Sequence, residues 1–247
     1  MIRNPRSVAE RAQSIEYAMF SFTKKMLGLL GGVLVVPGAF SLFKTEDVRK
    51  IGSYRLGSGL EDLELTYRLQ TSGCKVSHSH QALAFTGGPK NIKTLFKQRL
   101  RWGFGFINTT YEYRKAVLNS RFGNFGFFTL PMSILSYLVI SCVFFISWYH
   151  MFSFLIDRIT IVRLVGLTQS AVSFNMFFAS TQALSFVGLV LMIFFFTFIL
   201  LGHRISRIRR MNLGNTAIFF LVYSFLVPFW VLKSIQNSLV RARPSWR

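Results

Sequence analysis

Two neighbouring carboxylates, Glu61 and Asp62, are the residues of this sequence best suited to acid–base chemistry. They stand out because the chain has only nine acidic residues against 29 Lys and Arg. The segment 57–59 before them reads Gly-Ser-Gly, and glycine allows a close approach between backbone and ligand. One of the two carboxylates could therefore act as a general base that takes a proton from an attacking hydroxyl group. The alternative is an acidic pair that stabilises the N-terminus of a solvent-exposed helix.

A second group of chemically useful side chains is Gln98, Arg101 and Trp102. Residues at this spacing share one face of a helix. Arginine binds phosphate oxygens through two parallel hydrogen bonds and can stabilise a departing diphosphate, while tryptophan offers a flat apolar surface to a sugar ring. The group therefore suits a nucleotide-sugar site. The alternative is a helix in a membrane interface, where Arg meets lipid headgroups and Trp lies among the interfacial aromatics.

His78 and His80 are two residues apart in a segment that alternates like a strand, so they point the same way. A metal ion needs more ligands than two imidazoles, and the sequence offers no third ligand at a suitable spacing. We therefore predict no metal site from the residues of this chain.

The elements that position these groups alternate between helical and extended patterns. Apolar residues recur every three to four positions in the helical segments and at every second position in the extended ones. We predict a helix over 5–30, a strand, turn and short strand over 32–44, a helical turn at Glu46-Asp47, a helix over 60–69 ended by Gly73, a strand over 74–85 and a long basic and aromatic interface helix over 91–118.

The second half of the chain has the composition of a membrane region. Residues 122–156, 164–203 and 211–232 contain no Asp, Glu, Lys or Arg. A spanning helix needs about 20 apolar residues. We therefore predict spans near 127–149, 178–201 and 214–234. The loop 203–210 carries four Arg and should be cytoplasmic, as should residues 1–126. The third segment either spans or re-enters the membrane, because Pro228 allows a kink.

Composition narrows the class of protein further. Hydrophobic residues make up 51% of the chain, the net charge is +20, and the mean hydropathy is positive. A basic chain can bind nucleic acid, anionic lipid or a phosphate-bearing substrate, but the basic residues form no stripe on a soluble module, so we expect no nucleic acid partner. Cys74 and Cys142 lie in unlike surroundings, which argues against a disulfide.

The order of these motifs resembles the membrane-bound family 2 glycosyltransferases, which include synthases of cellulose, chitin, hyaluronan and poly-N-acetylglucosamine. The resemblance covers residues 10–105 by motif and the remainder by architecture. It is carried by Gln13-Ser-Ile-Glu16-Tyr17, Val36-Pro-Gly38-Ala39-Phe40, Glu61-Asp62-Leu-Glu64-Leu, and Gln98-Arg-Leu-Arg101-Trp102 ahead of the membrane segments.

The resemblance implies an α/β fold followed by transmembrane helices. Residues 1–90 would be the acceptor half of a GT-A-type domain. Residues 91–126 would contain the interface helix with its Gln-x-x-Arg-Trp motif, and residues 127–247 would form about three membrane segments. The catalytic part would be cytoplasmic and the protein a multi-pass protein of the plasma membrane.

The resemblance also implies roles for individual residues. Asp62 would be the catalytic base of an inverting hexosyltransferase, with Glu61 as its neighbour, and the acceptor would be bordered by Gly38, Ala39 and Phe40. Gln98, Arg101 and Trp102 would lie at the mouth of a polymer channel. The partners implied are a nucleotide-sugar donor, a glycan acceptor and the lipid bilayer, and the cofactor is Mg or Mn, with ligands that are not in this chain.

Two departures from the family pattern matter. Leu60 stands where the motif usually has Thr, so a hydroxyl at the helix start is lost. No strand–helix alternation and no Asp-x-Asp motif precede Gln13, so we expect a chain that lacks the donor-binding half and is inactive without a separately encoded N-terminal half. A non-catalytic membrane remnant or scaffold, or a non-processive transferase acting on a lipid acceptor, remains an alternative. A transporter fits poorly because no acidic residue lies within a predicted span.

Overall fold

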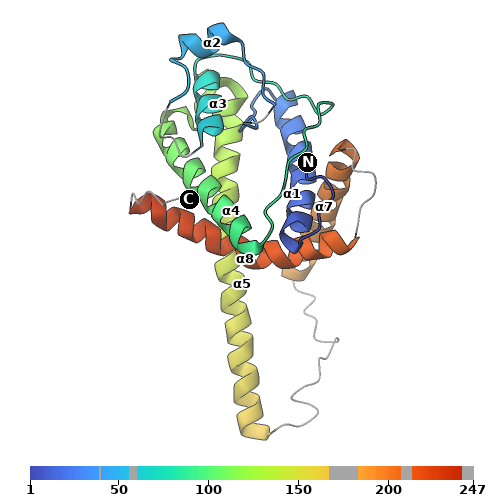
Figure 1. The fold of residues 1–247 in the computed structure, drawn as a ribbon. Helices are drawn as coiled ribbons and strands as arrows, with labels where there is room; N and C mark the ends of the chain where they lie inside the picture. The colour runs from blue at the N-terminus through green and yellow to red at the C-terminus, as the bar shows by residue number, and fades with distance from the viewer. Residues whose placement is uncertain (39, 56–59, 167–182, 207–212, 241–247) are drawn as a thin grey trace. The chain divides into compact units, whose positions relative to one another are not determined.

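In the computed structural model, the described residues are 1–38, 40–55, 60–166, 183–206 and 213–240, and their regular structure is helical (Figure 1). The chain forms two compact units. The first consists of Met1–Tyr137 together with Phe198–Arg247, and the second of Leu138–Thr197. All residues predicted for the catalytic site belong by sequence to the first unit.

Helix α1 (Val8–Leu29) begins with a capping box. The Ser7 hydroxyl accepts a hydrogen bond from the Glu10 amide at 3.1 Å, and the Glu10 carboxylate accepts one from the Ser7 amide at 3.0 Å. These bonds satisfy backbone donors that a helix N-terminus otherwise leaves unpaired. Gly31, with φ of +71°, follows the helix. The helix predicted over 5–30 is confirmed.

Helix α3 (Glu61–Thr71) is buried from Leu63 to Gln70 and is anchored by an arginine. The Arg68 guanidinium donates to the Glu64 carboxylate at 3.0 Å and to the carbonyls of Ile51 and Ser53 at 2.7 and 2.6 Å. Both carbonyls follow the short helix α2 (Thr45–Lys50), so Arg68 fixes α3 against that turn. The predicted helix and helical turn are both confirmed.

The two predicted strand regions, 32–44 and 74–85, form no strand among their described residues, and the α/β prediction is wrong for this part of the chain. An isolated bridge joins Ile2 to Thr86. In residues 33–36, side chains of α3 bind main-chain groups that a neighbouring strand would otherwise bind. The Gln70 amide donates to the Val33 carbonyl at 2.6 Å, and the Thr66 hydroxyl accepts from the Val36 amide at 3.1 Å.

Helix α4 (Ile92–Glu112) carries the Gln-x-x-Arg-Trp motif and begins at Asn91, whose side chain accepts from the Thr94 amide at 2.8 Å. It ends earlier than the predicted limit of 118. Two short 3-10 turns follow, η1 (Arg114–Ala116) and η2 (Ser120–Phe122). Between them Leu118 has a φ of +58°, a conformation that an α-helix does not accommodate.

Helices α3 and α4 share one hydrophobic core. The Tyr67 ring packs edge-to-face on Phe125, with centroids 5.0 Å apart, and its hydroxyl is hydrogen-bonded to Thr110 on α4 at 3.1 Å. Burying a tyrosine with its hydroxyl paired avoids the cost of an unsatisfied polar group. The core cluster consists of Leu63, Tyr67, Phe106, Ala116, Phe125 and Leu130.

Among the described residues, two helical segments are long and apolar enough to cross a membrane, Phe125–Leu164 and Leu213–Leu239. The first is a π-helical turn, η3 (Phe125–Thr129), that continues as α5 (Leu130–Val165). The helix that contains the predicted span 127–149 is longer than that span and continues through Asp157 and Arg158. Helix α7 (Ala183–Ser206) covers part of the predicted span 178–201, whose residues 178–182 lie outside the described residues. Its stretch Met192–Ser206 is a shorter apolar helix.

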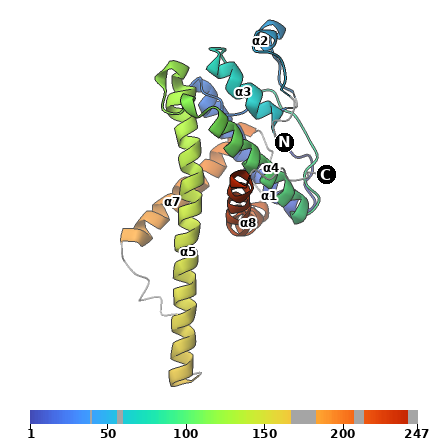
Figure 2. The ribbon, with the colours of Figure 1, turned by 90° about the vertical axis from the view of Figure 1, so that its left-hand side faces the viewer.

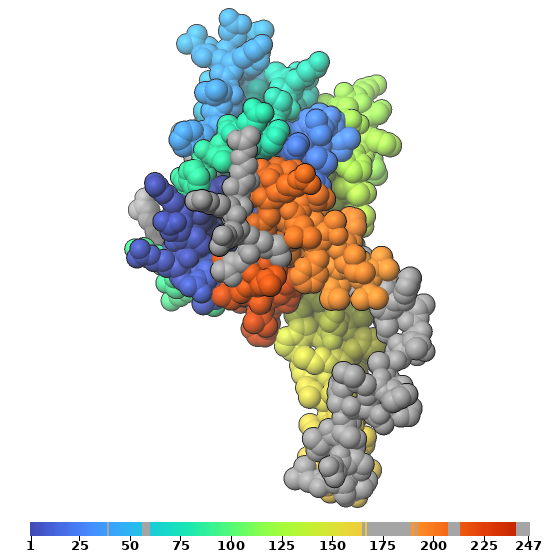
Figure 3. Space-filling view, turned by 90° about the vertical axis from the view of Figure 1, so that its right-hand side faces the viewer, coloured from blue at the N-terminus to red at the C-terminus, as the bar shows by residue number. Residues whose placement is uncertain are grey.

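Helix α8 (Leu213–Leu239) runs without interruption through Pro228 and lies across α1 and α4 (Figures 1 and 2). Contact with α4 is close because Gly103 lacks a side chain: a Cβ there would lie 2.4 Å from the Ser234 hydroxyl. Figure 3 shows the face on which α1 and the end of α7 meet α8. The predicted segment 214–234 therefore lies in a helix that packs on α1 and α4 within the first unit.

Candidate active site

A cavity of about 640 Å³ lies in the first unit, between segments that are far apart in sequence. Its walls come from the segment after α1, the start of α3, the segment before α4, and α4 itself. Both predicted chemical groups contribute to it. The lining residues are Gly38, Phe43, Tyr54, Leu60, Glu61, Asp62, Thr86, Arg101 and Trp102.

Asp62 occupies the first turn of α3, where the positive end of the helix dipole favours a carboxylate. One of its oxygens, Oδ1, accepts a hydrogen bond from the Leu63 amide at 2.9 Å. The other, Oδ2, would lie 3.7 Å from a Cβ placed on Gly38. One oxygen is thus oriented by backbone, and the other faces the glycine that borders the cavity.

Leu60 is the N-cap of α3, and no side chain caps the helix there. The missing hydroxyl is replaced by an apolar contact with α4. A Cβ placed on Gly105 would lie 2.5 Å from the Leu60 Cγ, so the glycine provides the space that the leucine fills. The carboxylates of α3 and the motif of α4 are therefore held together by direct packing next to the cavity.

Lys24 of α1 adds a cation near the Asp62 carboxylate. Burial lowers the pKa of the Lys24 ammonium group, and the negative charge of Asp62 acts in the opposite direction. Burial disfavours a charged amine, whereas a nearby carboxylate stabilises it. The surroundings of Asp62 therefore include positive charge from α1 as well as from α4.

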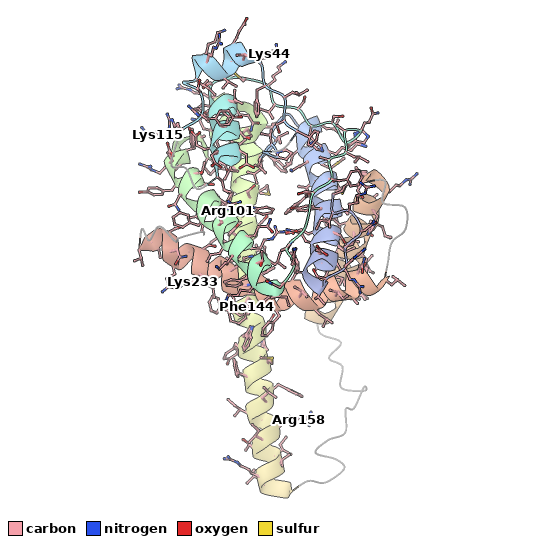
Figure 4. The ribbon with its side chains drawn as sticks, in the orientation of Figure 1. Lys44, Arg101, Lys115, Phe144, Arg158 and Lys233 are labelled. Atoms are coloured by element: carbon pink, nitrogen blue, oxygen red, sulfur yellow. The ribbon has the colours of Figure 1, made fainter. Side chains whose placement is uncertain are left out.

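Arg101 and Trp102 are adjacent on α4, and both line the cavity. Arg101 is labelled in Figure 4. The Arg101 side chain is exposed and Trp102 is partly buried. Behind Trp102 lies the buried guanidinium of Arg99, with its carbon 4.2 Å from the centre of the indole ring. A cavity with carboxylates on one side and a guanidinium and an indole on another can bind a phosphate group and a sugar ring beside a potential base.

Among the described residues, two of the predicted site residues, Gln98 and Phe40, do not line this cavity. The side-chain oxygen Oε1 of Gln98 accepts a hydrogen bond from the side-chain amide of Gln13 on α1 at 2.8 Å, so Gln98 joins two helices. Phe40 is 86% exposed and has a φ of +63°. Ala39 lies outside the described residues. The structure thus brings Glu61, Asp62, Arg101, Trp102 and Gly38 together, and leaves Gln98 and Phe40 apart from them.

The cavity also contains residues that the sequence patterns did not single out. Phe43 and Tyr54 pack edge-to-face with ring centroids 6.4 Å apart, and Thr86 adds a hydroxyl group. Aromatic surfaces are suited to the apolar faces of sugar rings. The sequence signal available for Tyr54 was its position next to Gly- and Ser-rich residues, but no periodicity connects it to Asp62.

Among the described residues, no group of three or more His, Cys, Asp or Glu side chains could hold a metal ion. His78, of the pair that we considered for metal binding, contacts α1: a Cβ on Gly28 would lie 3.3 Å from its own Cβ. Burial lowers the pKa of its imidazole, and the nearby Lys24 charge acts in the same direction.

Comparison with known proteins places this site in context. A profile of the family described as Glycosyl transferase family group 2 matches residues 2–232. A poly-beta-1,6-N-acetyl-D-glucosamine synthase of Staphylococcus epidermidis is 24% identical over 191 residues, which are 76% of this chain and 44% of that protein. A protein of the same name from Staphylococcus aureus (strain COL) is 31% identical over 105 residues, which are 42% of this chain and 26% of that protein. No solved structure matches at a significant level.

The chain thus spans less than half the length of these relatives. The profile match, however, extends from before α1 into α8 and includes every residue that lines the cavity. The chain belongs to the glycosyl transferase family group 2.

Proposed function

We propose that this chain forms the acceptor side of a membrane-bound, inverting glycosyltransferase that adds sugars from a nucleotide-diphosphate donor to a growing polysaccharide. The observation that carries the proposal is the shared cavity, in which Asp62 and Glu61 of α3 face the same space as Arg101 and Trp102 of α4. The names of the curated relatives suggest N-acetylglucosamine as the sugar.

In this mechanism Trp102 stacks on the terminal sugar of the acceptor and places one of its hydroxyl groups near Asp62. The Asp62 carboxylate takes the hydroxyl proton as the oxygen attacks the anomeric carbon of the donor sugar. The bond from that carbon to the diphosphate breaks, and the electron pair leaves with the diphosphate, whose charge Arg101 neutralises. A single displacement of this kind inverts the configuration at the anomeric carbon.

A divalent cation would assist the leaving diphosphate in the same way. Since no suitable cluster occurs among the described residues, its ligands would have to come from elsewhere. Apart from Arg101, the cavity offers no group that we assign to the donor, and we propose that a further polypeptide segment supplies the remaining donor-binding residues.

The test uses the native protein in membranes of the cells that produce it. The membranes are incubated with radiolabelled nucleotide sugars, and incorporation into polymer is measured for wild type and Asp62→Asn. Removing a general base typically costs about 10²- to 10⁴-fold in rate. Asp47→Asn, on the short helix α2, is the matched control and should retain activity. Wild-type incorporation that survives in Asp62→Asn would refute the assigned base.

A further inference from the structure

A buried cluster of three polar side chains lies beside the cavity and connects three helices. The Glu16 carboxylate of α1 accepts a hydrogen bond from the Arg99 guanidinium of α4 and another, at 2.7 Å, from the Tyr223 hydroxyl of α8. Both bonds end on the same carboxylate oxygen. Arg99 and Tyr223 are only 5% and 7% exposed, so the cluster is shielded from water.

Stability alone does not explain this Glu16–Arg99–Tyr223 cluster. Removing two charges from water costs several kcal/mol per ion, and apolar residues of similar volume often serve equally well. Burial raises the pKa of the Glu16 carboxyl, while Arg99 and Tyr223 counteract that rise. Ionised side chains that are costly to bury, but that are hydrogen-bonded to specific partners, fix the relative positions of the helices that carry them, as buried polar groups do in some proteins.

The geometry that the cluster fixes is that of Trp102. The Arg99 guanidinium lies over the indole ring at 4.2 Å, and the ring of Tyr223 is 5.9 Å from the same guanidinium carbon. The Arg99 Nε has no hydrogen-bond partner among the described residues. The bond from Gln13 to Gln98, the residue directly before Arg99, ties the same stretch of α4 to α1.

We propose that Arg99, held by Glu16 and Tyr223, is a positioning residue that sets the orientation of the Trp102 indole and thereby the affinity for the acceptor sugar. Through Tyr223, helix α8 becomes part of the acceptor site although none of its residues lines the cavity. This inference rests on the proposed function only for the identity of the ligand. The orientation of Trp102 can be tested without any sugar.

The first experiment observes Trp102 directly. The native protein is labelled with 5-fluorotryptophan, purified in detergent and examined by 19F NMR, and the Trp102 resonance is assigned with Trp102→Phe. We expect Arg99→Lys, Glu16→Gln and Tyr223→Phe each to shift or broaden that resonance and to leave that of Trp148 unchanged. Tyr223→Phe removes only a hydroxyl group and should fold. Tyr111→Phe, on the exposed side of α4, is the matched control. An unchanged Trp102 resonance in the three variants would overturn the proposal.

The second experiment measures binding of a β-1,6-linked N-acetylglucosamine oligosaccharide to the same proteins. A cation–π contact contributes about 0.5–2 kcal/mol, so Tyr223→Phe and Arg99→Lys should weaken affinity by about 2- to 30-fold. A shifted resonance with unchanged affinity would overturn the link to acceptor binding. If the variants shift the Trp102 resonance but the wild-type protein binds no oligosaccharide, the proposed acceptor is overturned and the positioning role of Arg99 stays intact.

Discussion

At the scale of single residues, the site depends on groups that share a cavity but come from different segments. Asp62 receives one hydrogen bond from the Leu63 amide and faces Gly38, while Arg101 and Trp102 extend from α4. The carboxylate of Asp62 and the guanidinium of Arg101 belong to different helices. This suits a reaction in which a proton leaves the acceptor oxygen and a diphosphate leaves the anomeric carbon. Each residue can therefore be tested by a different measurement.

Replacing Arg101 should weaken binding of the leaving group. We expect Arg101→Ala to reduce affinity for uridine diphosphate by about 10- to 150-fold, because a hydrogen bond to a charged group contributes about 1.5–3 kcal/mol. Arg101→Lys should recover only part of the loss, because lysine keeps the charge without the two parallel donors. Isothermal titration calorimetry on the native protein measures both effects. Lys97→Ala, an exposed change on the same helix, is the control, and equal affinity in Arg101→Ala would contradict the role.

The sequence could indicate these residues but not all of their neighbours. The spacing of Arg101 and Trp102 on a helix follows from the residue order, and so does the acid pair at the start of α3. Phe43, Tyr54 and Thr86 line the cavity because irregular segments of the chain run beside it. The path of an irregular segment has no periodic sequence pattern from which it could be predicted. The cluster around Arg99 was missed for the same reason, because its partner Tyr223 is far away along the chain.

At the scale of elements, the helices were predictable and the strands were not. Helical segments carry their own signals, such as the capping box at Ser7 and the cap at Asn91. A strand needs a partner, and in residues 33–36 the partner is provided by side chains of Gln70 and Thr66. The apolar pattern of these segments therefore did not show which groups the backbone would bind.

The capping box of α1 should make stability depend on pH. Hydrogen bonds from the amides of Ser7 and Arg6 lower the pKa of the Glu10 carboxyl below its ordinary value of 4.5. The stabilisation is therefore complete above pH 4.5 and is lost as the pH falls through the lowered value. We expect Glu10→Gln to lose less stability than wild type on acidification, as measured by chemical unfolding in detergent. Glu46→Gln, exposed on α2, should behave like wild type.

The close contact between α4 and α8 should be sensitive to a single methyl group. A Cβ on Gly103 would lie 2.4 Å from the Ser234 hydroxyl and 2.9 Å from its Cβ, so Gly103→Ala must displace α8. Overpacking of this kind costs about 1–3 kcal/mol. Thermal unfolding should show the loss. Gly87→Ala, where no atom lies within 4 Å of the added carbon, is the control. An unaltered midpoint in Gly103→Ala would show that the two helices are not packed as described.

At the scale of the whole molecule, the chain combines a polar site with apolar helices. Figure 4 labels Phe144 and Arg158 on α5. Apolar side chains of this helix such as Val143 and Ile146 are more than half exposed. Exposed apolar surface over 36 residues of helix is expected to be covered by lipid. The number of membrane segments and the cytoplasmic side of the site stay predictions, as does the three-part division at residues 90 and 126.

Charges placed on α5 should oppose membrane insertion. We expect Val143→Lys combined with Ile146→Lys to move the protein from the carbonate-resistant membrane fraction to the soluble or degraded fraction, because each lysine near the centre of a span costs about 2.5–3.5 kcal/mol. Leu42→Lys, at a fully exposed position in the first unit, should leave the distribution unchanged. A doubly substituted protein that stays in the carbonate-resistant fraction would refute a spanning α5.

The bond from Tyr223 to Glu16 has a consequence for biosynthesis. The ribosome completes α1, α3 and α4 long before it reaches α8, so the surroundings of Trp102 stay unfinished until α8 has been made. A nonsense mutation between codons 103 and 223 would therefore spare every residue that lines the cavity and still yield a protein in which the support of Trp102 is incomplete.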